Sequence, residues 1–268
     1  MNHDFKPTGP VVTCLAIGVS AFLILPLLVI FYYSIQGGAY FQLIPEEFSW
    51  RWFVAAWNNE RFVASALNSL WTGLIVTPLS VGMALPTSYV LVRYQIPFKS
   101  ALNALIMSPL LVPGAVSGIA FLTFFGIIDL HDGGVRNVLA MTCFTFPFAV
   151  RAIAANLQGI GTVWEDAGES LGASKWQVWF WILLPMLRPG MLAGGIFVFV
   201  ETIDNFSITV FLVNRQSMTI PIEVYNYIRD FDDPSVAVVA VVSVVFSTLL
   251  MFAVERLIGL ERFMQGGN

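Results

Sequence analysis

Long apolar runs separated by short polar segments limit the folds open to this chain more than any other feature. The first run, Val11–Ile35, is long enough to cross a bilayer with some tilt, and it is longer than the apolar core of a signal peptide. Of the 268 residues, 57% are hydrophobic and 11% are charged, with a mean hydropathy of +0.77, whereas soluble domains carry about 25% charged residues. The sequence therefore predicts an all-α, polytopic transmembrane helix bundle with a retained first helix.

Six runs are expected to cross the membrane within a single domain that covers residues 1–268. The expected spans are residues 11–35, 62–92, 100–128, 135–157, 187–213 and 235–254, with polar loops at 36–61 and 214–234. The third run contains Pro109 and Pro113, which break helical hydrogen bonding and survive in a membrane only where protein or water satisfies the freed backbone groups. We therefore expect this break to line a bundle interior or a cavity.

An even number of spans places both termini on the same side of the membrane. Lys and Arg are more frequent in the segments on the side of the termini than in those on the opposite side. Because such residues favour the cytoplasmic side, we expect both termini in the cytoplasm, together with the segment 163–185.

Several function classes are excluded by what the sequence lacks. It has no GxxxxGK[ST] motif to cradle the phosphates of ATP, and its two histidines, His3 and His131, are too isolated to form a nucleophile–base pair. No cluster of Lys and Arg is present that would bind nucleic acid. Cys14 and Cys143 both lie in apolar runs, which argues against a disulfide framework or a metal site. We expect no catalytic residue, metal or cofactor in this chain, and an energy source in another polypeptide or an ion gradient.

The segment 163–185, called here the 163–185 loop, is unusually rich in charges and helix-forming residues for a connection between spans. Its start predicts a short helix over Val163–Leu171, because acidic side chains suit the first turn of a helix. Gly172 can adopt a positive φ and end that helix, and Ser174 can cap a second helix that stops before Pro185. Two short helices joined at a glycine predict a rigid projection that docks in the groove of a partner. The alternative is an amphipathic helix lying on the membrane surface.

Two carboxylates, Glu201 and Asp204, lie inside the expected fifth span. They are three residues apart and therefore share a helix face. A carboxylate at the middle of a membrane costs about 3 kcal/mol, so such residues normally face a bundle interior or water. They are expected either to line a path for a cationic or amine-bearing solute, or to form a structural polar network with Thr202, Asn205 or a neighbouring helix.

The spacing within the 163–185 loop resembles the cytoplasmic EAA loop of binding-protein-dependent ABC importer permeases. Asp166-Ala167-Gly168 stands where that family has Glu-Ala-Ala, and Gly172, Ile182 and Leu184-Pro185 follow at the family's spacing. By this resemblance, contact with a partner ATPase is expected for Glu165, Asp166, Ala167, Gly168, Leu171, Gly172, Ala173, Leu184 and Pro185.

The resemblance extends to the fifth span, since residues 199–211 resemble the corresponding segment of spermidine/putrescine-type permeases. It implies a MetI-like permease fold in a bacterial inner membrane and a polyamine or another amine-bearing small solute. It also implies three partners besides the lipid bilayer: a second permease subunit in a heterodimer, a cytoplasmic ATPase dimer that binds ATP and Mg, and a periplasmic solute-binding protein. The solute pathway would then include Glu201, Thr202, Asp204 and Asn205.

Two other classes of protein remain open at this point. In a secondary transporter driven by an ion gradient, Glu201 and Asp204 would form a proton or sodium site, and the broken third helix would suit such a protein. In a membrane scaffold or sensor that transports nothing, the intramembrane carboxylates would have no use.

Overall fold

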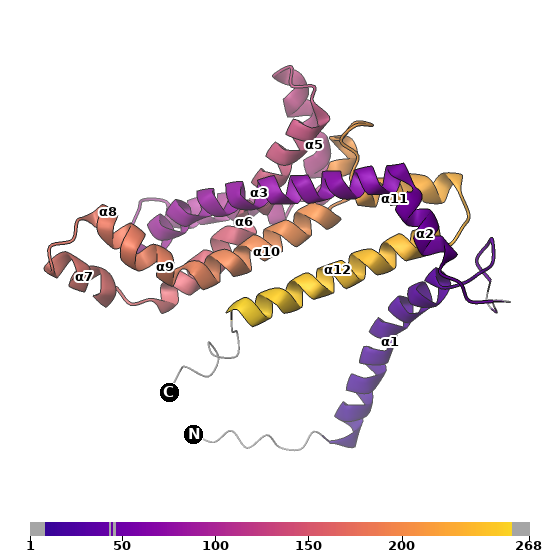
Figure 1. Ribbon diagram of the computed structural model, residues 1–268. Coiled ribbons are helices and arrows are strands. Elements are labelled where there is room, and N and C mark those ends of the chain that lie inside the picture. The colour runs from indigo at the N-terminus through magenta and orange to yellow at the C-terminus, as the bar shows by residue number, and fades with distance from the viewer. Residues whose placement is uncertain (1–8, 43, 45–46, 259–268) are drawn as a thin grey trace. The chain divides into compact units, whose positions relative to one another are not determined.

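The computed structural model describes residues 9–42, 44 and 47–258, and it divides the chain into two compact units (Figure 1). Unit 1 comprises residues 1–62 and 226–246, and unit 2 comprises residues 63–225 and 247–268. Among the described residues the regular elements are helices, apart from one isolated β-bridge between Gln36 and Phe48. This confirms the predicted all-α class. Residues 1–8 and 259–268 at the two termini lie outside the described residues.

Unit 1 contains α1 (Pro10–Ser34) and α2 (Arg51–Asn58), together with the end of α11 (Ile220–Asp230) and the first half of α12 (Ser235–Ile258). Tyr227 is central to its packing, with ring centroids 4.8 Å from Phe62 and 4.6 Å from Phe231, and its hydroxyl donates to Asp233 Oδ2 at 2.8 Å. Burial and this carboxylate raise the pKa of Tyr227 to about 12.

Unit 2 is built on α3 (Glu60–Arg93), which starts at the division between the units, α6 (Gly133–Gly159) and α10 (Arg188–Asp204). It also contains the start of α11, the second half of α12, and the shorter elements α4 (Lys99–Met107), η1 (Ser108–Leu110), α5 (Gly114–Ile127), α7 (Val163–Ser170), α8 (Lys175–Gln177), η2 (Val178–Leu183), α9 (Leu184–Met186) and η3 (Thr209–Phe211). Figure 1 shows α3, α6 and α10 running alongside one another, with α7, α8 and α9 at one end of this bundle.

Small residues let the three long helices of unit 2 approach closely. On α10, a Cβ atom at Gly190 would lie 2.7 Å from the Cβ of Asn156, and one at Gly194 would lie 3.0 Å from the Cα of Ala149 on α6. On α3, the hydroxyl of Ser88 is fully buried and donates to the carbonyl oxygen of Val150 at 3.1 Å. Close backbone approach and hydrogen bonds between helices are how helices associate in lipid, where apolar burial alone gives little driving force.

The predicted break in the third apolar run is confirmed. The pair Lys99–Leu110 and Gly114–Ile127 bends by 100° at the segment that contains Pro109 and Pro113. Beyond the bend, Gly118 packs on the segment that follows α10, because a Cβ at this position would lie 2.6 Å from the Phe211 ring.

Each of the six apolar runs contains an apolar helical segment. Within the described residues α1, α3 and α6 are long and apolar enough to cross a membrane. Two bent pairs, Lys99–Leu110 with Gly114–Ile127 and Lys175–Met186 with Arg188–Asp204, add two more if each pair is one span. The helix α12 contributes a shorter apolar stretch, Ser235–Leu249.

Two sequence-based expectations about local structure are wrong. The expected loop 36–61 contains α2, and the expected loop 214–234 contains α11. Both helices are short and amphipathic, so their polar residues lie on one face of a helix rather than in an irregular loop. In the expected fifth span, α10 ends at Asp204 rather than near Val213, for a reason given below.

Candidate functional site

The 163–185 loop folds as two short helical pieces joined at Gly172, as predicted. Gly172 has φ +88°, a conformation that costs other residues a steric clash of the Cβ atom. The Ala173 N–H donates to the Gly168 carbonyl at 3.1 Å, and the Gly172 N–H donates to the Glu169 carbonyl at 2.9 Å. These two bonds form a Schellman motif that satisfies the carbonyl groups at the end of α7.

The second helical piece begins at Ser174, which forms a capping box with Gln177. The Gln177 side chain accepts from the Ser174 N–H at 2.7 Å, and the Ser174 hydroxyl accepts from the Gln177 N–H at 3.4 Å. Two N–H groups at the start of this helix, which have no partner in the helical backbone, are thereby hydrogen-bonded by side chains of the same turn.

The expectation that this helix stops before Pro185 is wrong. The chain instead forms a π-helical turn over Val178–Leu183, continues through Pro185 to Met186, and then bends by 64° into α10. Proline lacks the N–H that an α-helix needs at this position, and its ring clashes with the preceding turn. A π-turn widens the helix just before the proline, which lets the helix continue instead of ending.

The two pieces of the loop pack against each other through Gly168, which is buried. A Cβ atom at Gly168 would lie 2.7 Å from Ile182 Cδ1 and 3.1 Å from Val178 Cγ2. Glycine at this position, where the EAA pattern has alanine, therefore lets α7 lie directly on the isoleucine of the same motif.

Arg93, at the end of α3, attaches the loop to the bundle. Its Nε donates to Glu165 Oε1 at 2.7 Å, and one terminal guanidinium nitrogen donates to the Ile160 carbonyl at 2.8 Å. The other Glu165 oxygen accepts from the Tyr89 hydroxyl at 3.0 Å, and the Tyr89 ring lies 4.8 Å from the Trp179 ring. No local sequence pattern connects Arg93 with Glu165, because the two residues are 72 positions apart.

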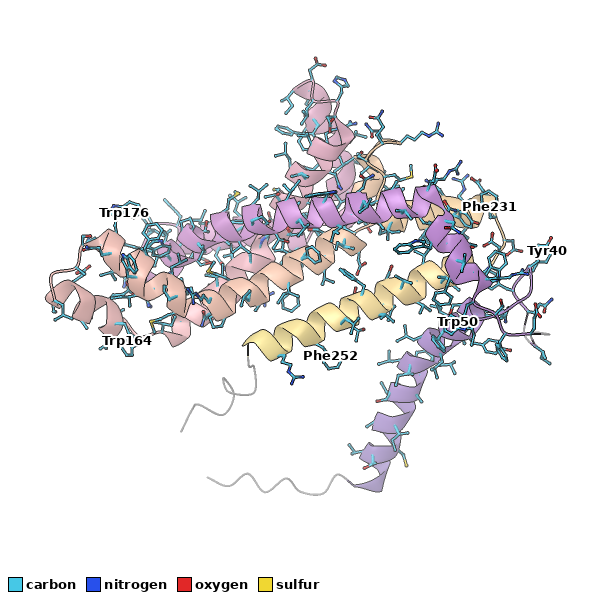
Figure 2. All side chains as sticks on the ribbon, viewed as in Figure 1. Tyr40, Trp50, Trp164, Trp176, Phe231 and Phe252 are labelled. Carbon is cyan, nitrogen blue, oxygen red and sulfur yellow. The ribbon has the colours of Figure 1, made fainter. Side chains whose placement is uncertain are left out.

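The outer surface of the loop is apolar and aromatic. Exposed residues on it are Val163, Trp164, Leu171, Trp176, Phe180 and Trp181. Leu171 is 90% exposed and Trp181 is 80% exposed, and Figure 2 shows Trp164 and Trp176 on this end of unit 2. A concentration of exposed large apolar side chains at one end of a unit is typical of a protein or membrane interaction site.

The residues expected to contact an ATPase differ in their exposure. Those that are exposed are Asp166, Ala167, Leu171 and Gly172, together with the neighbouring acid Glu169. Glu165, Ala173, Leu184 and Pro185 are half-buried, and Gly168 is buried.

The second cluster of predicted site residues lies where α10 ends. The residues Glu201–Ile208 are called here the α10 break. Asn205 has the extended φ and ψ of −72° and 110°, and its side-chain oxygen accepts from the Ile208 N–H at 3.0 Å. The Asn205 amide nitrogen donates to Glu201 Oε1 at 3.0 Å. Asparagine thus ends one helix and starts the next turn, which is why α10 is shorter than the apolar run.

The four predicted pathway residues divide into two kinds. Thr202 is 1% exposed, and its hydroxyl donates to the Val198 carbonyl of its own helix at 2.6 Å, while Asn205 is buried and bonded through both amide atoms. Asp204 is exposed and Glu201 is half-buried. Neither carboxylate forms an ion pair within the described residues. Both lie in the last helical turn, where the helix dipole adds partial negative charge to that of the carboxylates.

Comparison with known proteins gives the family. Residues 77–259 match the family described as "Binding-protein-dependent transport system inner membrane component". The chain is 24% identical to the sulfate transport system permease protein CysT of Escherichia coli strain K12, over 79% of this chain and 82% of that protein. It is 23% identical to the spermidine/putrescine transport system permease protein PotC of Haemophilus influenzae, over 87% and 90% of the two chains.

A further relative and a solved structure are similar over most of the chain. The molybdenum transport system permease protein ModB of Escherichia coli strain K12 is 29% identical, over 72% of this chain and 93% of that protein. A bacterial ABC transporter that imports the acidic polysaccharide alginate has a subunit with the same fold, with a TM-score of 0.73 at 15% identity over 94% of this chain and 98% of that one. The chain therefore belongs to the family of inner-membrane permease components of binding-protein-dependent ABC importers.

Proposed function

We propose that this chain forms half of the solute pathway of an ABC importer, paired with a second permease subunit in the inner membrane. In this arrangement both termini and the 163–185 loop lie in the cytoplasm, and a solute-binding protein delivers solute from the periplasm. The family, the similarity to the alginate importer fold and the excess of Lys and Arg on one side of the spans all support this arrangement.

The 163–185 loop serves in this proposal as the site that docks on a cytoplasmic ATPase dimer, which binds ATP and Mg. The exposed acids Asp166 and Glu169 and the fixed Gly172 corner together support docking over a helix lying on the membrane. Closure of the ATPase would shift the bundle between inward-open and outward-open states, which is a two-state equilibrium biased by ATP and by the loaded binding protein.

The solute in this proposal is a small cation such as a polyamine. The α10 break is the observation that supports it, because Glu201 and Asp204 lack a cationic partner within the described residues and lie at the negative end of a helix. The relatives named above carry sulfate, molybdenum or spermidine and putrescine. Carboxylates that face the path would repel an oxyanion, so the α10 break favours the polyamine relatives as the functional comparison.

The test is purification of the tagged chain in mild detergent from its own host, with mass spectrometry of every protein that accompanies it. We expect an ATPase, a second permease and a binding protein whose titration with spermidine or putrescine gives a signal that sulfate and molybdate do not. A chain that purifies alone, and that takes up solute in vesicles with only an ion gradient, would establish the secondary transporter instead. A binding protein specific for sulfate or molybdate would overturn the assignment of a cation while leaving the importer intact.

A further inference from the structure

We propose that Arg93 and Glu165 form a positioning pair that holds the 163–185 loop rigidly on α3, so that movement of the docked ATPase reaches the helix bundle. This inference rests on the proposed function of the loop. It also divides the acids of α7 by role, with Glu165 acting within the chain and Asp166 and Glu169 remaining available to the partner.

The bonding around Glu165 supports this division of roles. Both of its carboxylate oxygens are occupied within the chain, one by Arg93 at 2.7 Å and the other by Tyr89 at 3.0 Å. The side chains of Arg93 and Glu165 are 12% and 14% exposed, so water screens the pair far less than it screens a surface pair. A carboxylate bonded on both oxygens offers little to a docking protein, whereas Asp166 and Glu169 are exposed.

Arg93 holds the loop at two points along the chain. Besides Glu165 on α7, its guanidinium binds the carbonyl of Ile160, which lies in the short connection between α6 and α7. Gly159 and Gly161 flank Ile160, and glycine leaves the backbone of a connection free to rotate. The guanidinium therefore fixes a connection that its own sequence leaves flexible.

The second helical piece of the loop rests on the same part of α3. The Trp179 ring packs edge-on against the Tyr89 ring at 4.8 Å, and Tyr89 also binds Glu165. Gly168 and Ile182 lock the two pieces of the loop together. A displacement of α7 by the ATPase is thus passed to α3 through one compact cluster of side chains.

The experiment measures coupling separately from docking. The complex is purified from a background in which Cys14 and Cys143 are alanine, and Ser207→Cys is introduced as a nearly isosteric, exposed reporter within the α10 break. The rate at which a maleimide labels this cysteine is then compared between the nucleotide-free complex and the complex trapped with ATP and vanadate. Arg188→Gln is the matched control, because it removes another arginine, exposed and close to the loop in sequence.

Arg93→Gln is expected to retain the ATPase but to reduce the nucleotide-dependent change in labelling rate by about five- to tenfold, within the usual range of coupling between sites. Glu165→Gln, which keeps the shape and can still accept hydrogen bonds, should reduce it less. Arg93→Gln that retains both the ATPase and the full labelling change would overturn the inference.

If Arg93→Gln loses the ATPase altogether, the exchanged pair Arg93→Glu with Glu165→Arg decides. Recovery of the ATPase in the exchanged pair supports positioning by the pair, and failure to recover it overturns the inference. Absence of any ATPase from the parent complex would instead refute the proposed function, so the two failures are distinguishable.

Discussion

Glu165 and Glu201 are both half-buried glutamates of unit 2, but their surroundings differ. Glu165 forms an ion pair with Arg93 and accepts a hydrogen bond from Tyr89, so both of its carboxylate oxygens are bonded within the chain. Among the described residues, Glu201 is bonded only by the neutral amide of Asn205, and Asp204 beside it is exposed. Breaking a buried ion pair destabilises a protein because it leaves an uncompensated charge. A carboxylate that has no cationic partner in the protein can instead be neutralised by a bound cationic solute. The difference is the basis for the proposal that Glu165 serves the architecture of the loop and that Glu201 and Asp204 serve a solute.

The largest effects are expected from changes that remove the shape or the charge of the 163–185 loop while leaving both glutamates in place. Gly172→Pro should abolish transport with membrane insertion intact, because proline cannot adopt φ +88° and lacks the N–H that binds the Glu169 carbonyl. Asp166→Lys should abolish transport as well, through reversal of an exposed charge at the docking surface. Uptake assays together with membrane fractionation check both variants, and normal uptake in either would refute the role of the loop in coupling.

The next largest effect is expected at the α10 break. The double variant Glu201→Gln with Asp204→Asn should reduce uptake of a cationic solute by about 10- to 100-fold, which corresponds to loss of charge-assisted bonds worth about 1.5–3 kcal/mol. The same variant should still purify with its ATPase in the same yield, because the 163–185 loop is untouched. The measurement is uptake of radiolabelled spermidine, with Arg188→Gln as the control, and unchanged uptake would place both carboxylates in a purely structural role.

A smaller effect is expected inside the 163–185 loop, at the contact between its two pieces. Gly168→Ala should destabilise the loop by about 1–3 kcal/mol through overpacking, since the new Cβ atom would lie 2.7 Å from Ile182 Cδ1. Adding Ile182→Val removes that methyl group and should recover part of the loss. Hydrogen exchange of the α7 amides in the purified complex measures both variants, and additive losses in the double variant would disprove the contact.

The smallest effect is expected for Tyr89→Phe, which removes one bond to Glu165 and leaves the ion pair with Arg93 intact. A lost hydrogen bond to a charged group costs about 1.5–3 kcal/mol, and here the remaining partner and nearby water offset part of it. We expect the nucleotide-dependent labelling change at Ser207→Cys to fall less than in Arg93→Gln. A fall as large as that of Arg93→Gln would show that Tyr89, rather than the arginine, holds the loop.

Local sequence was sufficient to predict much of this molecule. The apolar runs predicted a membrane protein made of helices, and Pro109 and Pro113 marked the break in the third run. Gly172 and Ser174 marked the corner and the cap of the 163–185 loop, and both features are present. These features follow from the backbone preferences of single residues and from bonds that reach only a few positions along the chain, so a short window of sequence contains the cause.

Only the tertiary structure decided how these pieces are used. Arg93 and Glu165 are 72 positions apart, and the residues that flank each of them in sequence do not predict that the two side chains pair. The end of α10 at Asp204 depends on Asn205 bonding forward to Ile208 and back to Glu201, while the surrounding run is apolar enough to continue as helix. Whether a charge belongs to the architecture or to a partner depends on which groups the fold brings within bonding distance, and that proximity is set by packing rather than by local preference.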